Sequence, residues 1–333
     1  MDRELFIQSS TRTRVLEKRL LDKIQMQRLI EADDVDELIR LLNDSQYQPF
    51  INKLERPEDY TQALAGEQQR FFTEMYGVSP RREVVDLVTL KYLYHNLKVI
   101  LKEKITGEDY SRMYINIGGV DMNKLKADFE AGNTPLENQR QYEDLNYVYT
   151  QYENMKDPQM IDILLDRAYF EELKVKAEAL DSEFFTQYVE DLIDLTNIKT
   201  LLRCQKQDKD PSFLNKVIIP GGSIDKSKYE EYLHTKVESN SNLFKSARIY
   251  YYASQGIAEF EKTGSLAGFE KMMDDYLMYI TSEAKRVTYG PEVIFAYLQT
   301  KETEIKNLGI IFVAKLNGLS PEFIRERLRD NNV

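Results

Sequence analysis

The chain of 333 residues contains no tryptophan, one cysteine and two histidines. A single cysteine, Cys204, excludes a disulfide within the chain and favours a reducing compartment. No metal-ligand spacing surrounds Cys204, so we expect a small, partly buried helix residue. His95 and His234 are accompanied by no nucleophilic serine or cysteine motif, which favours surface or structural roles. We therefore expect no catalytic residue, no metal and no cofactor.

Proline and glycine are also sparse, at 9 and 14 residues. Few chain breakers favour helices over a turn-rich β fold. Hydrophobic residues make up 42% of the chain and charged residues 30%, which is typical of a folded protein. The length exceeds what one ordinary helical core accommodates and predicts two or three domains.

Long apolar runs and excess positive charge are missing as well. The longest apolar stretches, around residues 217–219 and 310–313, fall far short of the roughly 20 residues that span a bilayer. The first residues lack the apolar core of a signal peptide, so we expect no secretory signal. The net charge of −11 argues against nucleic acid or anionic lipid as the main partner. Any association with a membrane is expected to run through another protein.

What the sequence does contain is a motif that recurs. Residues 94–102 read YHNLKVILK, and residues 195–203 read LTNIKTLLR about 100 residues later. Residues 302–310, ETEIKNLGI, form a third and weaker copy. Each copy follows the order polar, aliphatic, lysine, any residue, aliphatic. Recurrence at a regular interval indicates a chain built from one repeated unit.

The motif places Lys98, Lys199 and Lys306 in equivalent positions. A lysine on an amphipathic helix commonly flanks the buried stripe and stays solvated. The alternative is that the three helices form equivalent walls of a central cavity. The third copy departs from the others, with Glu304 in place of asparagine and Gly309 in the aliphatic run. This departure suggests that the last unit has a contact of its own.

Two glycine-rich turns follow the first two copies. Residues 115–124 read INIGGVDMNK and residues 218–228 read IIPGGSIDKSK. We expect each to be a turn that needs glycine conformations, with Asp121 or Asp225 as the N-cap of the next helix. No strand precedes either Gly-Gly pair in the manner of a nucleotide-binding loop, so we do not expect phosphate binding.

The boundaries of the repeats fall just after these turns. They divide the chain into helical units at residues 1–122, 123–228 and 229–333, each a plausible domain size. The predicted fold class is all-α, with three similar helical domains.

The acidic cluster at residues 33–37, DDVDE, allows an enzymatic interpretation. All-helical isoprenoid synthases bind Mg²⁺ through aspartate-rich helices, and this chemistry needs a second metal-binding helix. Asp274 and Asp275 lack the further carboxylates of such a helix. We therefore interpret Asp33 or Asp34 as the N-cap of a helix whose first turn is acidic.

Several motifs together resemble the C subunit family of V/A-type (vacuolar/archaeal-type) rotary ATPases, whose eukaryotic counterpart is the d subunit. They are residues 12–21, the two Gly-Gly turns, Asn96-Leu97-Lys98, Asn197-Ile198-Lys199 and the C-terminal run from Gly290-Pro291-Glu292 to Leu308. The resemblance covers nearly the whole chain, and the C-terminal run is its most specific part.

The resemblance implies a pseudo-threefold funnel that sits on the membrane rotor ring, peripheral to the membrane on its cytoplasmic face. The funnel would receive the central shaft, made of subunits D and F, and so couple ATP hydrolysis or synthesis to ion transport without an active site of its own. Candidate contact residues of this socket are Lys98, Lys199, Lys306, Tyr297, Lys301 and Glu304.

A second interpretation stays open. A helical repeat scaffold could hold other proteins together without a rotary role. It predicts an open superhelix, whereas the resemblance predicts a closed funnel.

Overall fold

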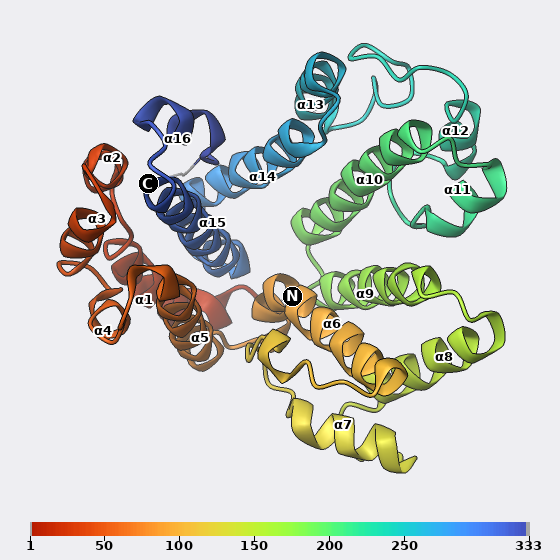
Figure 1. Ribbon diagram of the computed structural model, residues 1–333, viewed down its shortest axis with the longest axis horizontal. Helices are drawn as coiled ribbons and strands as arrows, with labels where there is room; N and C mark the ends of the chain where they lie inside the picture. The colour runs from red at the N-terminus through yellow and green to blue at the C-terminus, as the bar shows by residue number, and fades with distance from the viewer. Residues whose placement is uncertain (1, 331–333) are drawn as a thin grey trace. The chain divides into compact units, whose positions relative to one another are not determined.

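The computed structural model describes residues 2–330 and contains no β-strand within them, which confirms the predicted all-α class (Figure 1). The chain folds into two compact units. Unit 1 comprises Met1–Val85 and Val237–Val333, and unit 2 comprises Asp86–Lys236. The predicted division into three repeats stays a prediction.

Unit 1 joins the two ends of the chain in one body. Its helices are η1 (Glu4–Phe6), α1 (Ile7–Glu17), α2 (Lys23–Glu31), α3 (Val35–Leu42), α4 (Gln48–Ile51), η2 (Pro57–Asp59), α5 (Tyr60–Val78), α13 (Tyr250–Thr263), α14 (Ala267–Ser282), η4 (Glu283–Arg286), α15 (Pro291–Leu316) and α16 (Pro321–Arg327).

Unit 2 is formed by the middle of the chain. Its helices are α6 (Arg82–Thr106, which starts at the end of unit 1), η3 (Ser111–Met113), α7 (Met122–Ala131), α8 (Gln139–Met155), α9 (Gln159–Ala179), α10 (Glu183–Lys206), α11 (Pro211–Val217) and α12 (Lys226–Glu231).

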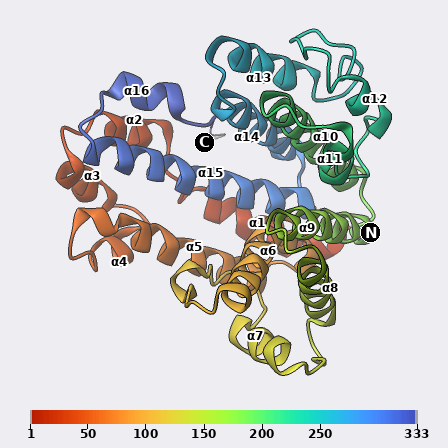
Figure 2. The ribbon, with the colours of Figure 1, turned by 45° about the vertical axis from the view of Figure 1, so that its right-hand side comes forward.

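Helix α15 is the central element of unit 1 (Figure 2). Gly290, with a φ of 149°, precedes it, and Pro291 supplies a φ suited to the first helical turn. Gly318 ends it in the left-handed region at a φ of 64°. Most of its 26 residues are buried, so the helix is enclosed rather than half-exposed.

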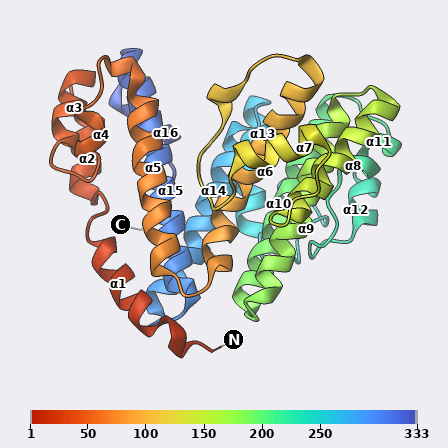
Figure 3. The ribbon, with the colours of Figure 1, turned by 90° about the horizontal axis from the view of Figure 1, so that it is seen from below.

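Helix α5 packs along α15 in the antiparallel direction (Figure 3). Tyr60 at the start of α5 stacks on Phe312 with ring centroids 4.8 Å apart. Phe71, further along α5, meets the earlier Tyr297 edge-on at 5.4 Å. Phe71, Tyr297 and Phe312 are buried, and a fully buried aromatic side chain contributes roughly 1.5–3 kcal/mol to stability, so this seam anchors unit 1.

Helices α6 and α9 pack against each other in unit 2, also antiparallel. Lys176 of α9 donates to Asp86 at 2.8 Å near the start of α6. The hydroxyl of Tyr94, two turns later, lies 2.9 Å from Glu172 and 2.8 Å from Asp144 of α8, so the two carboxylates share its single proton. Burial, followed by the charge of Glu172, raises the pKa of the Tyr94 hydroxyl far above its usual range.

Both Gly-Gly turns have the predicted form. Gly118 and Gly221 adopt φ values of 101° and 99°. Asp121 accepts from Lys124 N at the start of α7, and Asp225 accepts from Ser227 N at the start of α12. The two predicted N-caps are thus confirmed.

The acidic cluster caps a helix, as predicted. Asp34 precedes α3 and accepts a 2.8 Å hydrogen bond from the backbone N–H of Glu37. The Glu37 carboxylate in turn accepts from Asp33 N at 2.6 Å. Cys204 lies in a helix, α10, as predicted, and is buried more completely than the partial burial expected. Within residues 2–330, none of the helices combines the length and the hydropathy that a bilayer-spanning segment needs.

Candidate functional site

The first lysine motif contains a side chain that binds a distant stretch of backbone. Asn96 of α6 donates through Nδ2 to the carbonyl of Ile115 at 2.9 Å, and its Oδ1 accepts from Ile115 N at 2.9 Å. Asn96 is almost completely buried. One amide side chain thus satisfies both backbone groups of a residue in the segment after the helix. We call this arrangement an asparagine clamp.

The second motif contains the same clamp. Asn197 of α10 donates to the carbonyl of Ile219 at 2.8 Å and accepts from Ile219 N at 2.9 Å. Ile219 directly precedes the Pro-Gly-Gly turn. The clamp fixes where that turn begins, because an unsatisfied backbone N–H or C=O would be costly in this buried place.

The third clamp lies in unit 1. Asn307 of α15 donates to the carbonyl of Arg329 at 3.0 Å and accepts from Arg329 N at 2.9 Å. It holds the segment after α16, just as the other two asparagines hold the segments after η3 and α11.

This third clamp corrects the register of the repeat. Asn307 corresponds to Asn96 and Asn197, and therefore Gly309, not Lys306, corresponds to Lys98 and Lys199. The sequence-based alignment is wrong here by three residues. That alignment matched Lys306 with the lysines of the other two copies. The structural equivalence depends instead on the buried amide of Asn307, whose backbone partner lies 22 residues away.

Lys98 crosses from α6 to α9. Its Nζ lies 2.8 Å from Asp166 and 3.1 Å from Asp162. Burial lowers the pKa of Lys98, but the negative charges of Asp166 and Asp162 outweigh it, so the net pKa is raised. The three residues line a polar pocket of about 620 Å³ in unit 2.

The other two candidate lysines lie in different environments. Lys199 follows Asn197 and Ile198 on α10 and is half-buried. Lys306 is exposed on α15 and forms an ion pair with Asp274 of α14. Arg329 donates to the same carboxylate at 2.9 Å, which ties the third clamp to α14. The predicted contact of these lysines with a shaft stays a prediction.

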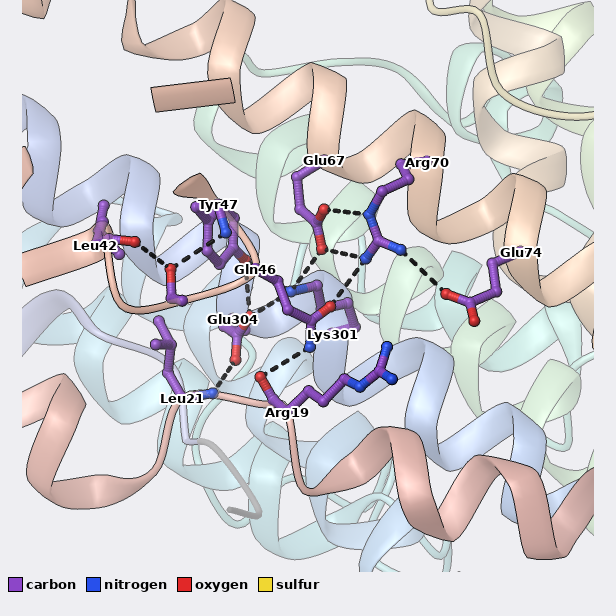
Figure 4. Close-up of polar contacts among 11 residues, drawn as sticks. Arg19, Leu21, Leu42, Gln46, Tyr47, Glu67, Arg70, Glu74, Lys301 and Glu304 are labelled. Carbon is purple, nitrogen blue, oxygen red and sulfur yellow. Dashed lines mark hydrogen bonds and ion pairs between the residues drawn. The ribbon is translucent and has the colours of Figure 1, made fainter. Parts of the chain in front are cut away.

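Lys301 and Glu304 lie inside unit 1, with no exposed side-chain surface (Figure 4). Lys301 Nζ lies 2.7 Å from Glu304 and 3.2 Å from Glu67 of α5, whose side chain is also fully buried. The Tyr47 hydroxyl donates to Glu304 at 2.7 Å, and Leu21 N donates to its other oxygen at 2.6 Å. We call these side chains, together with Arg70, the buried ionic cluster.

Arg70 is the second cation of the cluster. It donates to both oxygens of Glu67, at 2.7 and 2.8 Å, and also to Gln46 at 2.9 Å. Gln46 donates onward to the carbonyl of Arg19. Arg70 also donates to Glu74 at 3.1 Å, so its charge is shared between Glu67 and a second, partly exposed carboxylate. The cluster joins α15 and α5 to the segments before α2 and α4.

The buried ionic cluster has a structural role. Burial, and next the negative charge of Glu304, raises the pKa of Tyr47 well above its usual range, so Tyr47 stays a neutral donor. Tyr297, another candidate, is also buried on α15 against Phe71. A partner protein could not touch Lys301, Glu304 or Tyr297 without opening unit 1. Their effect on any interface runs through the placement of α15.

An apolar groove lies between α5 and α15, next to α16. It has a volume of about 620 Å³ and is open to solvent. Helix α5 contributes Tyr60, Thr61, Leu64, Ala65 and Gln68 to its lining, and α15 contributes Ile305, Lys306, Gly309, Ile310, Val313 and Ala314. Leu319, Phe323 and Arg327 complete the lining. Of the candidate residues, only Lys306 borders it.

Sequence reasoning missed most of these features. Glu67 and Tyr47 carry no signal that separates them from surface residues, because a buried charge is recognisable only by its partners. Asn307 did carry a signal, since the dipeptide Asn307-Leu308 repeats Asn96-Leu97.

Comparisons with known proteins agree with the whole-chain pattern. The sequence profile of the family described as "ATP synthase (C/AC39) subunit" matches residues 9–327. The chain is 29% identical over 316 residues to the C subunit of the V-type sodium ATPase of Enterococcus hirae, which covers 94% of each protein. It is 25% identical over 338 residues to the C subunit of the A-type ATP synthase of Methanocaldococcus jannaschii, covering 96% of this chain and 85% of that protein. The corresponding protein of Pyrococcus abyssi is 24% identical over 330 residues, covering 95% of this chain and 88% of that protein.

Proposed function

Since the chain belongs to the ATP synthase (C/AC39) subunit family, we propose that it is the non-catalytic adaptor of a V/A-type rotary ATPase, between the rotating shaft and the membrane rotor ring. Its partners would be shaft subunits D and F on one side and the ring subunits on the other. The observation that carries the proposal is the family match, which extends over both units of the chain.

An adaptor of this kind must transmit torque without deforming. Close-packed helices have low compressibility and therefore pass strain on. The enclosed helix α15, joined to α5 by aromatic contacts and by the buried ionic cluster, has this character. The asparagine clamps add stiffness, because each one ties a long helix to the segment that follows it.

The proposal includes three equivalent domains, at residues 1–122, 123–228 and 229–333, arranged as a pseudo-threefold funnel. The recurrence of the asparagine clamp on α6, α10 and α15 supports this division, since one structural device appears once in each domain. Lys98, Lys199 and Lys306 are the candidate residues for polar contact with the shaft. The protein would lie on the cytoplasmic face of the membrane and reach it through the ring.

Co-purification with the neighbouring subunits tests this function. The full chain and the shaft subunits D and F, mixed and passed over a sizing column, should elute as a complex of fixed stoichiometry. The D–F pair alone and the chain alone serve as references. Elution of the chain at its own position, with no D or F at any concentration tried, would contradict the proposal.

A further inference from the structure

Three oxygen atoms form a short row where α6, α8 and α9 meet in unit 2. The Tyr94 hydroxyl of α6 lies 2.8 Å from Asp144 Oδ2 of α8 and 2.9 Å from Glu172 Oε2 of α9. Both separations are hydrogen-bond distances, so each contact needs a proton. Tyrosine supplies one proton, and an ionised carboxylate supplies none. With both carboxyls ionised, one contact would bring two oxygen atoms together without a proton between them.

Glu172 has partners that suit a carboxylate. Gln141 of α8 donates to Glu172 Oε2 at 2.9 Å. Lys176 Nζ lies 3.4 Å from Glu172 Oε1, and Arg140 Nε lies 3.6 Å from Oε2. An amide donor and two cations thus surround this side chain, and it can accept the proton of Tyr94 as well.

Asp144 has fewer partners. Within the part of the chain that the structure describes, its carboxyl forms a single hydrogen bond, with Tyr94. Burial is the largest cause that raises the pKa of Asp144, and the negative charges of Glu172 and Glu171 on α9 add to it. The hydrogen bond with Tyr94 and the charge of Arg140 lower the same pKa without reversing the rise. Asp144 is therefore the carboxyl on which a second proton is best placed.

Other charged and titratable groups at the junction already have partners. Lys176 of α9 lies 2.8 Å from Asp86, near the start of α6, in addition to its contact with Glu172. Tyr169 of α9 meets the ring of Tyr94 edge-on, with centroids 5.8 Å apart. Helix α7 also packs against α8 and presents the ring of a phenylalanine to it. The lysine of α9 is thus committed to carboxylates other than the one on α8.

We propose that this junction binds a proton on Asp144 and that release of the proton loosens α8 from α6 and α9. In the proton-bound state, Asp144 donates to the Tyr94 oxygen and Tyr94 donates to Glu172, so each contact contains one proton. Asp144 is half-buried, so its proton can leave to water. Two ionised carboxylates then flank one hydroxyl and repel each other across the junction. The inference concerns unit 2 alone and does not depend on the adaptor role.

The attachment of α8 should weaken as pH rises. An aspartate in an unfolded chain has a pKa of about 3.9. Since the pKa of Asp144 is raised in the folded state, its stabilising contribution is complete below about pH 4 and is lost as pH rises through the folded-state pKa. Between the two pKa values, a difference of one bound proton changes an opening equilibrium by up to about tenfold per pH unit. The junction is thus a latch that closes when a proton binds.

NMR measures the ionisation of Asp144 in the full chain. The signal of its side-chain carboxyl carbon, in isotope-labelled protein, is followed from acidic to neutral pH. We expect a titration midpoint above the value of about 3.9 for unfolded aspartate. Glu172→Gln should lower the midpoint, because this change removes a negative charge and leaves the Tyr94 proton to Asp144. Glu143→Gln removes an exposed carboxylate from the same helix and should leave the midpoint unchanged.

Amide hydrogen exchange measures how firmly α8 is held. Exchange rates in α8, corrected for the pH dependence of free amides, should give an opening constant that rises with pH in the parent, by up to about tenfold per pH unit. Asp144→Asn has no carboxyl to ionise and should lack this rise. Glu143→Gln should follow the parent. Circular dichroism verifies the fold of each variant.

Three results would overturn the proposal. The first is an Asp144 midpoint at or below that of unfolded aspartate, which the parent protein alone decides if a variant does not fold. The second is a midpoint that Glu172→Gln leaves unchanged. The third is the same pH dependence of α8 opening in Asp144→Asn as in the parent. None of them bears on binding to the shaft, which the co-purification with D and F tests separately.

Discussion

Asn307 holds both backbone groups of Arg329, with hydrogen bonds of 3.0 and 2.9 Å, across 22 residues of sequence. The same pairing joins Asn96 to Ile115 and Asn197 to Ile219. It is the clearest structural relation among the three copies of the motif, and it makes Gly309 the counterpart of Lys98 and Lys199.

Replacing a clamp asparagine by alanine should destabilise its unit. Asn197→Ala leaves two buried backbone groups of Ile219 without partners, and we expect a loss of about 2–3 kcal/mol in the free energy of unfolding. Asn307→Ala should cost less, about 1–2 kcal/mol, because the Arg329 backbone is only partly buried and water can replace the lost bonds. Urea unfolding measures both. Unchanged midpoints would show that the clamps carry no stability.

Removing the charge of Lys301 alone should destabilise unit 1 more than removing it together with the charges of Glu67 and Glu304. Lys301→Met leaves Glu67 and Glu304 buried with one counterion fewer, and we expect a loss of about 3–5 kcal/mol. The triple variant Lys301→Met, Glu67→Gln, Glu304→Gln should lose less than Lys301→Met alone, since no uncompensated charge remains buried. Chemical denaturation gives the loss for each of the three single variants and for the triple variant. If the loss of the triple variant equals the sum of the three single losses, the cluster is not a coupled unit.

Tyr47 should make stability depend on alkaline pH. Its pKa is raised in the folded state, so its contribution is complete below pH 10, the value for an unfolded tyrosine, and declines as pH rises above that value. A difference of one bound proton between the folded and unfolded states changes the free energy of unfolding by about 1.4 kcal/mol per pH unit. The Tyr47→Phe variant should therefore lose stability less steeply than the parent between about pH 10 and 12. Tyr251→Phe, at an exposed position, is the control, and identical slopes for all three proteins would contradict the prediction.

Two glycine-to-alanine changes should act in opposite directions. Gly309→Ala should stabilise unit 1 by about 0.5–1 kcal/mol, because the helix gains propensity and the new Cβ meets only ordinary contact. Gly222→Ala should destabilise unit 2 by more than about 1 kcal/mol. Its Cβ would lie 2.1 Å from Asp194 Oδ1, and Asp194 is held in place by Ser223, Ile224 and Tyr229. Thermal melts of both variants check this pair.

Charge reversal tests whether Lys98 faces a partner or only its own unit. Lys98→Glu should weaken binding of the D–F shaft if the lysine is part of the socket. The double swap Lys98→Glu, Asp166→Lys restores an internal ion pair. Shaft binding that returns with the swap would assign Lys98 to internal pairing and remove it from the socket. Lys124→Glu, at an exposed position on α7, controls for the change in net charge.

The helices, their caps and the Gly-Gly turns could be predicted from the sequence because they depend on neighbours in the chain. Asp34, Asp121 and Asp225 each cap a helix by accepting a hydrogen bond from a backbone N–H two or three residues ahead, within reach of local reasoning. The buried ionic cluster could not be predicted. Lys301 and Glu304 read as an ordinary surface pair at i, i+3, and only the distant Tyr47 and Glu67 make them interior residues.

The alignment of the third motif copy with the first two could be predicted only in part. The dipeptide Asn307-Leu308 was visible, but Lys306 offered a more conspicuous match to Lys98 and Lys199. The contact between Asn307 and Arg329 determines the register, and no local sequence pattern predicts that contact.

ATP-driven ion pumping by the reconstituted complex tests the adaptor role most directly. Complexes assembled in vesicles with and without this chain are compared for ATP hydrolysis and for ion accumulation in the same preparation. We predict that omission of the chain abolishes pumping while hydrolysis by the soluble sector continues, and that adding the purified chain back restores pumping. Undiminished pumping without the chain would contradict the account.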